Sequence, residues 1–223
     1  MLLGGCWFSA VGHAQTLNLI NSWSIPTGVR DYVTSGTTER GIAINPVNDH
    51  VYLVSRAGVL RTKVLEVATG AELLGDVYTE FIAGGTFPLS TIGVADDGVI
   101  YAANLVNPAS DSVQYVIYRW LAEDQAYDEV YRGNPSDGMR FGDCLDVRGS
   151  GLNTQIAVGT ANAATDVRFA IFTTADGNTF TPTAFSPAGV AAGALQKGIT
   201  FGPGDTVIGK VNGNQIGRGS CRE

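Results

Sequence analysis

Short apolar segments of four residues return at regular intervals along the chain, and each is followed by a polar turn and a second apolar segment. The first segments begin at Gly41, Thr91, Cys144 and Gly198, which gives spacings of 50, 53 and 54 residues. Runs of this length between turn-forming residues are typical of β-strands. We therefore expect first strands at 41–44, 91–94, 144–147 and 198–201, and second strands at 51–54, 99–103, 155–158 and 206–209.

Two further strands complete each of the first three units. Third strands are expected at 63–67, 113–120 and 169–173, and fourth strands at 72–77, 128–131 and 181–185. Four antiparallel strands in about fifty residues are typical of one blade of a β-propeller, and the small apolar residues of the first strands suit a crowded central axis. The pattern predicts an all-β, incomplete β-propeller. Its three four-stranded blades lie near 40–77, 90–133 and 142–186, and a truncated fourth lies at 197–213.

The composition fits many short strands that are joined by tight turns. The 223 residues include 29 glycines, and only 16% of the residues are charged. The formal net charge is −7, and no run of five or more Lys or Arg residues occurs. Nucleic acid and anionic membrane surfaces are therefore not expected partners, because a polyanion needs a basic face.

Residues 1–14 read as most of a secretory signal peptide. An apolar stretch leads into Gly12-His13-Ala14, which places small residues at positions −3 and −1 of a cleavage site. The basic start of a signal is missing, since no Lys or Arg precedes Arg30, and a short buried strand is the alternative. The segment is too short to cross a bilayer, so no transmembrane segment is expected there. We expect a bacterial protein that is secreted, periplasmic or on the cell surface, and that begins near Gln15 when mature.

The mature chain is expected to form one domain, 15–213. Residues 214–223 resemble translated adapter sequence instead of a native terminus, and an ordinary disordered tail is the alternative. Three and a half blades cannot close a ring. The first and last units should then each show an uncovered apolar face, unless residues 17–25 pair as an outer strand. We expect the chain alone to aggregate until the missing downstream blades of the same chain are restored.

Residues that could carry covalent or metal chemistry are few. If 1–14 are removed and 214–223 are not native, Cys144 is the one cysteine left, which excludes a disulfide framework and a Cys-rich zinc site. His50 lies in a turn that we expect on the opposite face from Cys144, so a Cys-His pair is disfavoured and Cys144 is expected to be structural. No EF-hand, phosphate-binding loop or dinucleotide fingerprint occurs, and no cofactor or metal is expected.

Several segments resemble propeller families. The bend at Thr69-Gly70 is similar to the Thr-Gly outer hairpin of propellers, where glycine supplies a positive φ. Residues 173–180 resemble the Asp-box turn of sialidase-type propellers, although Ala175 stands where the box has its Asp. Four segments together are similar to a bacterial exported propeller-like domain family of unknown function: 38–46, 92–104, 142–149 and 172–177. This resemblance extends from about Trp23 to Lys210 and implies no activity, because the family has none assigned.

Candidate ligand-binding residues come mainly from loops that precede first strands or follow second strands, since these loops open on one face of a propeller. A ring of such residues would suit a carbohydrate or a small anion. The candidates are Arg40, Arg56, Asn104, Asp143, Asp146 and Lys197. Asp96-Asp97 is instead interpreted as turn chemistry. Asp146 has an alternative role as a buried carboxylate that pairs with Arg148 or with a backbone amide.

The sequence favours a non-catalytic function, in which an exported module binds a glycan or another small molecule or acts as a scaffold. The alternative is a propeller-type polysaccharide hydrolase or lyase with Asp143, Asp146 or Arg40 in its site. An enzyme of that kind would bring two titratable groups within about 5–9 Å in one cleft. A binding module would instead show exposed aromatic rings or scattered polar groups.

Overall fold

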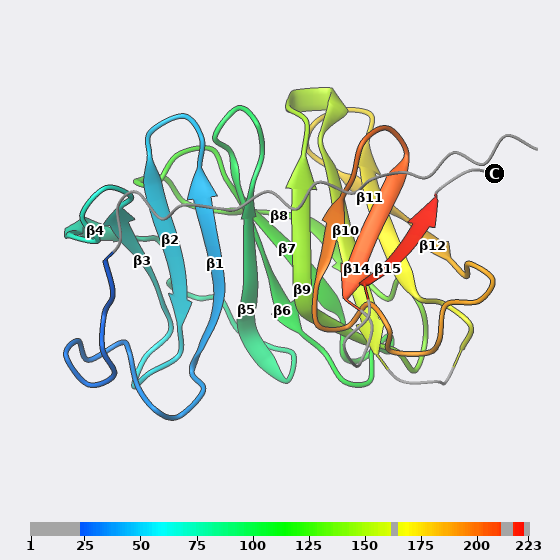
Figure 1. The fold of residues 1–223 in the computed structure, drawn as a ribbon, viewed down its shortest axis with the longest axis horizontal. Helices are drawn as coiled ribbons and strands as arrows, with labels where there is room; N and C mark the ends of the chain where they lie inside the picture. The colour runs from blue at the N-terminus through cyan, green and yellow to red at the C-terminus, as the bar shows by residue number, and fades with distance from the viewer. Residues whose placement is uncertain (1–22, 162–164, 211–215, 221–223) are drawn as a thin grey trace, which may run out of the picture.

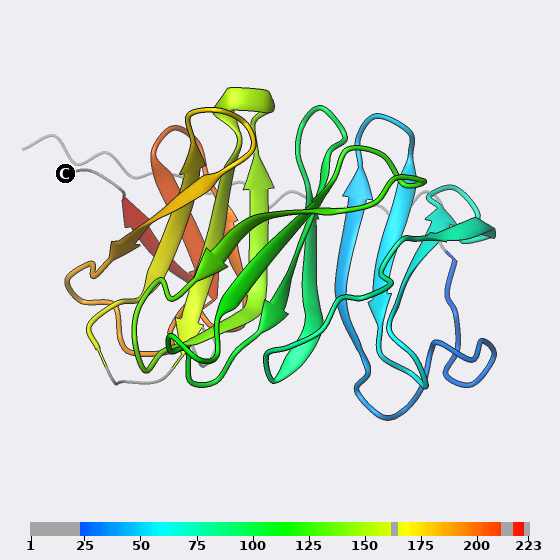
Figure 2. The same ribbon diagram turned by 180° about the vertical axis from the view of Figure 1, so that it is seen from behind.

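The protein consists of four antiparallel β-sheets that follow one another in chain order. The structure is a computed structural model, and it describes residues 23–161, 165–210 and 216–220. Figures 1 and 2 show the sheets side by side along the long axis, from blue at one end to orange and red at the other. The described residues contain no α-helix, and the one 3₁₀ turn is η1 (Gly151–Asn153). The expectation of an all-β fold is confirmed, whereas residues 1–14 and 17–22 lie outside the described residues.

Each sheet is a meander in which consecutive strands are hydrogen-bonded neighbours. Sheet 1 contains β1 (Glu39–Asn45), β2 (His50–Ser55), β3 (Arg61–Glu66) and β4 (Glu72–Val77). Sheet 2 contains β5 (Phe87–Val94), β6 (Ile100–Leu105), β7 (Tyr115–Trp120) and β8 (Asp128–Gly133). Sheet 3 contains β9 (Arg140–Arg148), β10 (Gln155–Ala161), β11 (Phe169–Thr174) and β12 (Phe180–Phe185). Sheet 4 contains β13 (Ile199–Phe201), β14 (Thr206–Lys210) and β15 (Ile216–Ser220).

The third strand of sheet 4 differs from the sequence-based expectation. The apolar pattern ends the fourth unit after its second strand and assigns 214–223 to a tail, but Ile216–Ser220 pairs with β14 as β15. The segment Ile-Gly-Arg-Gly-Ser has no apolar alternation, so it carries no strand signal of its own. The free edge of β14 provides backbone donors and acceptors, and pairing with that edge makes this segment a strand.

Neighbouring sheets are held together by the first strands. In sheets 2, 3 and 4 the first strand directs two apolar residues onto the sheet before it. These pairs are Ile92 and Val94, Leu145 and Val147, and Ile199 and Phe201. Ile92 and Val94, for example, share a core cluster with Tyr52 and Val54 of sheet 1. The side chains of successive first strands therefore place each sheet face to face with the next.

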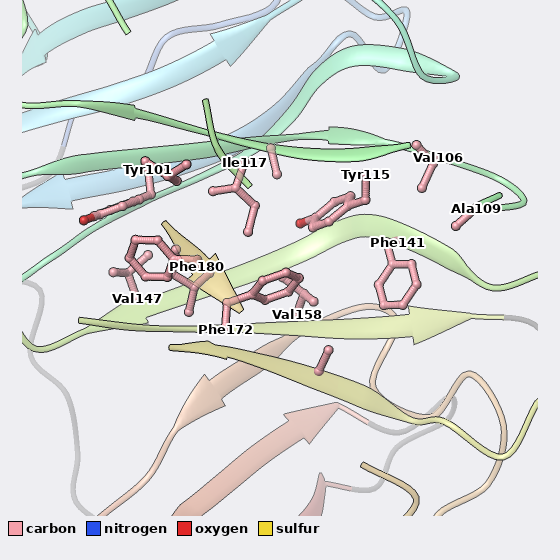
Figure 3. Close-up of a cluster of buried hydrophobic side chains, with 14 of the residues drawn as sticks. Tyr101, Val106, Ala109, Tyr115, Ile117, Phe141, Val147, Val158, Phe172 and Phe180 are labelled. Atoms are coloured by element: carbon pink, nitrogen blue, oxygen red, sulfur yellow. The ribbon is translucent and has the colours of Figure 1, made fainter. Parts of the chain in front are cut away.

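The largest core cluster lies between sheets 2 and 3 (Figure 3). Tyr115 of β7 lies against Phe172 of β11 with ring centroids 6.0 Å apart, and Tyr101 meets Phe180 edge-on at 5.7 Å. Every residue of β6 and β7 is buried. Sheet 2 has a neighbour on each face, so its central strands carry apolar side chains on both faces and lack the alternation of a half-exposed strand.

The outward face of sheet 1 is covered only in part. Trp23 donates a hydrogen bond from Nε1 to the carbonyl oxygen of Val67 (2.7 Å), and its ring lies against Gly70. Ile42 and Ile44 of β1 are 66% and 60% exposed. The expectation of an uncovered apolar face on the first unit is confirmed at β1. The described residues of 17–25 pack on this face without pairing as an outer strand of the sheet.

Among the described residues, no helix has the length and apolar character needed to cross a membrane.

Candidate functional site

The loops of the four sheets gather on two opposite faces. The tight turns between first and second strands (46–49, 95–99, 149–154 and 202–205) define the turn face, which is uppermost in Figure 1. The segments that link one sheet to the next (78–86, 134–139 and 186–198) and the loops after the second strands of sheets 1 and 2 (56–60 and 106–114) define the crossover face. The candidate residues of the sequence analysis were expected on the crossover face.

Arg40 and Arg56 lie close together where sheet 1 opens on the crossover face. Glu39 pairs with Ser55 and Gly41 with Val54, so Arg40 is the extra residue of a β-bulge at the start of β1. The backbone N–H of Arg56 donates to the carbonyl oxygen of Thr38 at 3.2 Å, which fixes the loop after β2 beside this bulge. A bulge interrupts the regular alternation of side chains along a strand. Arg40, the bulged residue, is exposed at the start of β1.

An open cavity of about 420 Å³ lies beside Arg56. Phe87 of β5 lies under the guanidinium, whose central carbon is 3.7 Å from the ring centroid. The lining combines the apolar surfaces of Leu60, Phe87 and Pro88 with the polar residues Gly36, Thr37, Thr38 and Arg56. We refer to it as the Arg56 cavity. An apolar wall with a few polar groups is the usual composition of a small-molecule site.

The charges at the Arg56 cavity are not balanced by the protein. Neither Arg40 nor Arg56 forms an ion pair among the described residues. The nearby carboxylate of Glu39 accepts from the Thr34 backbone N–H (3.0 Å) and the Thr38 hydroxyl (2.7 Å). Burial lowers the pKa of Arg56, and the positive charge of Arg40 lowers it further. This corner therefore carries positive charge in a chain of negative net charge.

Asn104 lies at the end of β6, but its side chain is used within sheet 2. Its Nδ2 donates to the carbonyl oxygen of Gln114 (3.0 Å), and its Oδ1 accepts from the Val116 backbone N–H (2.9 Å). The residue is buried, and its amide satisfies backbone groups where β6 meets β7. Asn104 thus has a structural role that accounts for both of its polar atoms.

Asp143 and Lys197 lie together between sheets 3 and 4, apart from the Arg56 cavity and its lining. Asp143 accepts two hydrogen bonds from Arg140, at 2.5 and 2.6 Å, and a third from Gln196 at 2.9 Å. Burial by itself would raise the pKa of Asp143, but the hydrogen bonds from Arg140 and Gln196 outweigh it, so the pKa lies below its ordinary value. The charge of exposed Lys197 acts in the same direction. Asp143 is thus an ionised carboxylate, and both of its oxygen atoms already accept hydrogen bonds from the protein.

Asp143 should make the folding stability depend on acid pH. Its pKa in the folded protein lies below the ordinary value of 3.8, so its contribution is complete above about pH 4 and is lost as pH falls through the folded-state pKa. Asp143→Asn is expected to lower the melting temperature at pH 7 and to weaken its decline in acid. Thermal unfolding followed by circular dichroism between pH 7 and pH 2 measures both effects. Exposed Asp111→Asn is the control, and equal curves for the two variants would contradict the prediction.

Asp146 and Cys144, both on β9, form hydrogen bonds to residues in or just before β13. Asp146 Oδ2 accepts from the backbone N–H of Phe201 (2.7 Å) and from the hydroxyl of Thr200 (2.8 Å). The alternative in which Asp146 pairs with a backbone amide is therefore the one observed. The Cys144 thiol donates to the carbonyl oxygen of Leu195 (3.2 Å), and burial raises its pKa to about 12. The hydrogen bond and the raised pKa agree with the structural role that we expect for Cys144.

A second polar cluster, on the turn face, was missed by sequence reasoning. Glu123 Oε1 accepts from His50 Nδ1 (2.7 Å), Tyr52 Oη (2.5 Å) and Asn48 Nδ2 (2.9 Å). Burial raises the pKa of Tyr52 to about 12, with a further contribution from Glu123. The cluster borders a cavity of about 460 Å³ between the turns of sheets 1 and 2. The sequence indicated only His50 as a candidate residue. Glu123 is seventy-three residues away, in the turn between β7 and β8, so no local pattern joins the two.

Asp96 and Asp97 act as turn residues, as predicted. Asp96 Oδ2 accepts from the Gly149 backbone N–H (3.1 Å), and Asp97 Oδ2 accepts from that of Gly151 (3.2 Å). Both carboxylates therefore connect the turn of sheet 2 to that of sheet 3. Within 23–161, 165–210 and 216–220, no group of three or more His, Cys, Asp or Glu side chains is placed to hold a metal ion.

Comparison with known proteins gives a structural likeness only. No protein-family model matches the sequence, and no curated protein does. The fold resembles that of a DUF4623 family protein from Bacteroides eggerthii DSM 20697. The TM-score is 0.64 at 16% sequence identity, and the match covers 82% of this chain and 43% of that protein. The chain therefore spans less than half the length of this bacterial protein, whose family is a domain of unknown function.

A weaker similarity relates the chain to a structure of the nidogen/laminin complex. Its TM-score is 0.38 at 11% identity, with 81% of this chain and 73% of the other covered.

Proposed function

We propose that this protein is an exported bacterial module of the β-propeller type, in which the four sheets are successive blades and the crossover face binds a ligand without catalysing a reaction. Support for the blades comes from the strand order, in which each sheet is a meander and each first strand contacts the next. Support for export comes from the apolar stretch and small residues of 1–14. The ligand is a carbohydrate or a similar small molecule.

The Arg56 cavity carries this proposal. It joins an exposed aromatic ring, an apolar wall and hydroxyl groups at the face on which the loops of neighbouring sheets converge. Sugars expose a C–H face and a rim of hydroxyls, so Phe87 and Pro88 would contact the ring while Thr37 would bond to the rim. The cavity volume lies within the usual range for small-molecule sites.

Binding is favoured over polysaccharide hydrolysis or elimination because the carboxylates that an enzyme would use are occupied. Asp143 is bound by Arg140 and Gln196, and Asp146 by Thr200 and the Phe201 backbone. A general acid needs a raised pKa and access to substrate, whereas the pKa of Asp143 is lowered by its hydrogen bonds. The hydrogen bonds of these carboxylates to β9 itself and to residues 196–201 support binding over catalysis.

The test is calorimetric titration of the protein with a panel of neutral and acidic mono- and oligosaccharides. At least one member should bind, and Phe87→Ala should weaken that binding about tenfold or more, because it removes the apolar contact of the ring. Phe81→Ala is the control, since Phe81 is also an exposed phenylalanine but does not line the cavity. The proposal fails if no member of the panel binds, or if Phe87→Ala and Phe81→Ala bind equally well.

A further inference from the structure

We infer that the Arg56 cavity takes a ligand that carries a carboxylate, such as a uronic acid sugar, and that Arg56 binds this group. The inference rests on the proposed function, because it names the ligand class of the same cavity.

The first argument is that the two guanidinium groups have no acceptor in the protein. Among the arginines whose side chains are described, only Arg40 and Arg56 donate no side-chain hydrogen bond to a described residue. Arg56 also lines the cavity, so part of its guanidinium faces the open space. The others, each with an acceptor, are Arg30, Arg61, Arg119, Arg132, Arg140, Arg148 and Arg168. A guanidinium that lines a cavity and has no acceptor in the protein can donate to an acceptor on a ligand.

The second argument is electrostatic. Arg40 and Arg56 are near enough for the charge of one to lower the pKa of the other, and no carboxylate forms an ion pair with either. Two like charges side by side repel each other, and the repulsion is strongest where one of them is partly removed from water. The bulge places Arg40 as an extra residue at the start of β1, beside the loop that carries Arg56. An anion bound at Arg56 would reduce the repulsion.

The third argument concerns the shape of the acceptor. Phe87 covers one flat face of the Arg56 guanidinium, which orients that side chain and leaves its in-plane N–H groups as the available donors. A guanidinium held in this way binds a planar carboxylate through two parallel hydrogen bonds. Thr37, Thr38 and Pro88 extend the lining beyond the guanidinium, so a sugar ring that bears the carboxylate has both hydroxyl and apolar partners.

The experiment compares D-galacturonate oligosaccharides with the matching neutral galactose oligosaccharides by calorimetric titration of the whole chain. The acidic probe should bind at least tenfold more tightly than the neutral one, and added salt should reduce this difference. Arg56→Gln should remove the preference and leave the neutral probe unaffected, while Arg56→Lys should recover only part of it, because lysine lacks the planar fork. Arg132→Gln removes one positive charge from an exposed residue outside the cavity lining and should change nothing.

The outcomes separate this inference from the proposed function. If neutral and acidic probes bind equally and Arg56→Gln changes neither, the carboxylate is overturned while sugar binding at the cavity stands. If galactose 6-sulfate binds through Arg56 but galacturonate does not, the assignment of a carboxylate is likewise overturned. If neither these probes nor any other sugar of the panel binds, the proposed function itself fails.

Discussion

Replacing both Ile42 and Ile44 with lysine is expected to reduce self-association of the chain and to shift it toward the 23.4 kDa monomer. The two side chains are 66% and 60% exposed on one face of β1. Their counterparts, Ile92 and Val94 of sheet 2, lie in the core against sheet 1. Exposed contiguous apolar surface at a sheet face favours association between molecules, and lysine opposes it. Multi-angle light scattering after gel filtration measures the change in mass distribution.

A matched variant keeps this test specific. Val59 and Leu152 are each 61% exposed and lie outside the strands, Val59 on a loop and Leu152 in η1, so Val59→Lys with Leu152→Lys adds the same charge elsewhere. Both double variants should melt at nearly the same temperature as the parent chain, because exposed substitutions usually change the free energy of unfolding by less than about 0.5 kcal/mol. The prediction would be contradicted if the parent chain is already a monodisperse monomer, or if both variants shift the mass distribution toward the monomer by the same amount.

Gly142→Ala is expected to lower the free energy of unfolding by about 3 kcal/mol or more, which is a fall of roughly 6–12 °C in melting temperature for a chain of this size. Gly142 has a φ of 98°, which L-residues with a side chain rarely adopt. A Cβ there would overlap the carbonyl oxygen of Asn104 and the Cα of Leu105, both of which are backbone atoms of a buried strand. The strand cannot move without disturbing the core between sheets 2 and 3.

The comparison for this prediction is Gly58→Ala. Gly58 also has a positive φ, 71°, but a Cβ there would meet no atom within 4 Å. Only the conformational cost remains, about 1 kcal/mol. Thermal and urea unfolding of the two variants separates the clash from the backbone conformation. If both alanines cost the same, the close approach of β9 to β6 does not constrain this position.

The candidate site was predictable in part. The sequence placed Arg40 and Arg56 on one face because both lie at ends of strands in the same hairpin, and this is a local relationship. It did not single out Phe87, which belongs to the next sheet and reaches Arg56 through an irregular stretch of β5. Asn104 lies near the end of β6, and Asp143 lies within β9 instead of preceding a strand as expected; the side chains of both are bonded within the protein. Position in a strand therefore predicts which face a residue occupies, but not what its side chain contacts.

The polar cluster at Glu123 also could not be predicted from position along the chain. His50 and Tyr52 belong to β2 and Glu123 to a turn of sheet 2, and the contact exists only because the two sheets lie face to face. Nothing in the spacing of these residues indicates it. Pairings between elements far apart in sequence depend on how the sheets are stacked, which no local pattern encodes.

The sequence by itself determined the strands of sheets 1 to 3, the first two strands of sheet 4, the turns between them and the near absence of helix in the described residues. These features depend on neighbouring residues, because alternating or continuous apolar runs form strands and glycine-rich polar segments form turns. Tertiary structure alone decided the chemistry of the candidate site. Whether Arg56 or Asp143 keeps free donors or acceptors depends on which side chains the fold brings within hydrogen-bond distance. At the Arg56 cavity the next sheet supplies a phenylalanine ring and no acceptor, whereas Asp143 binds Arg140 of its own strand and Gln196 of the segment that leads into sheet 4.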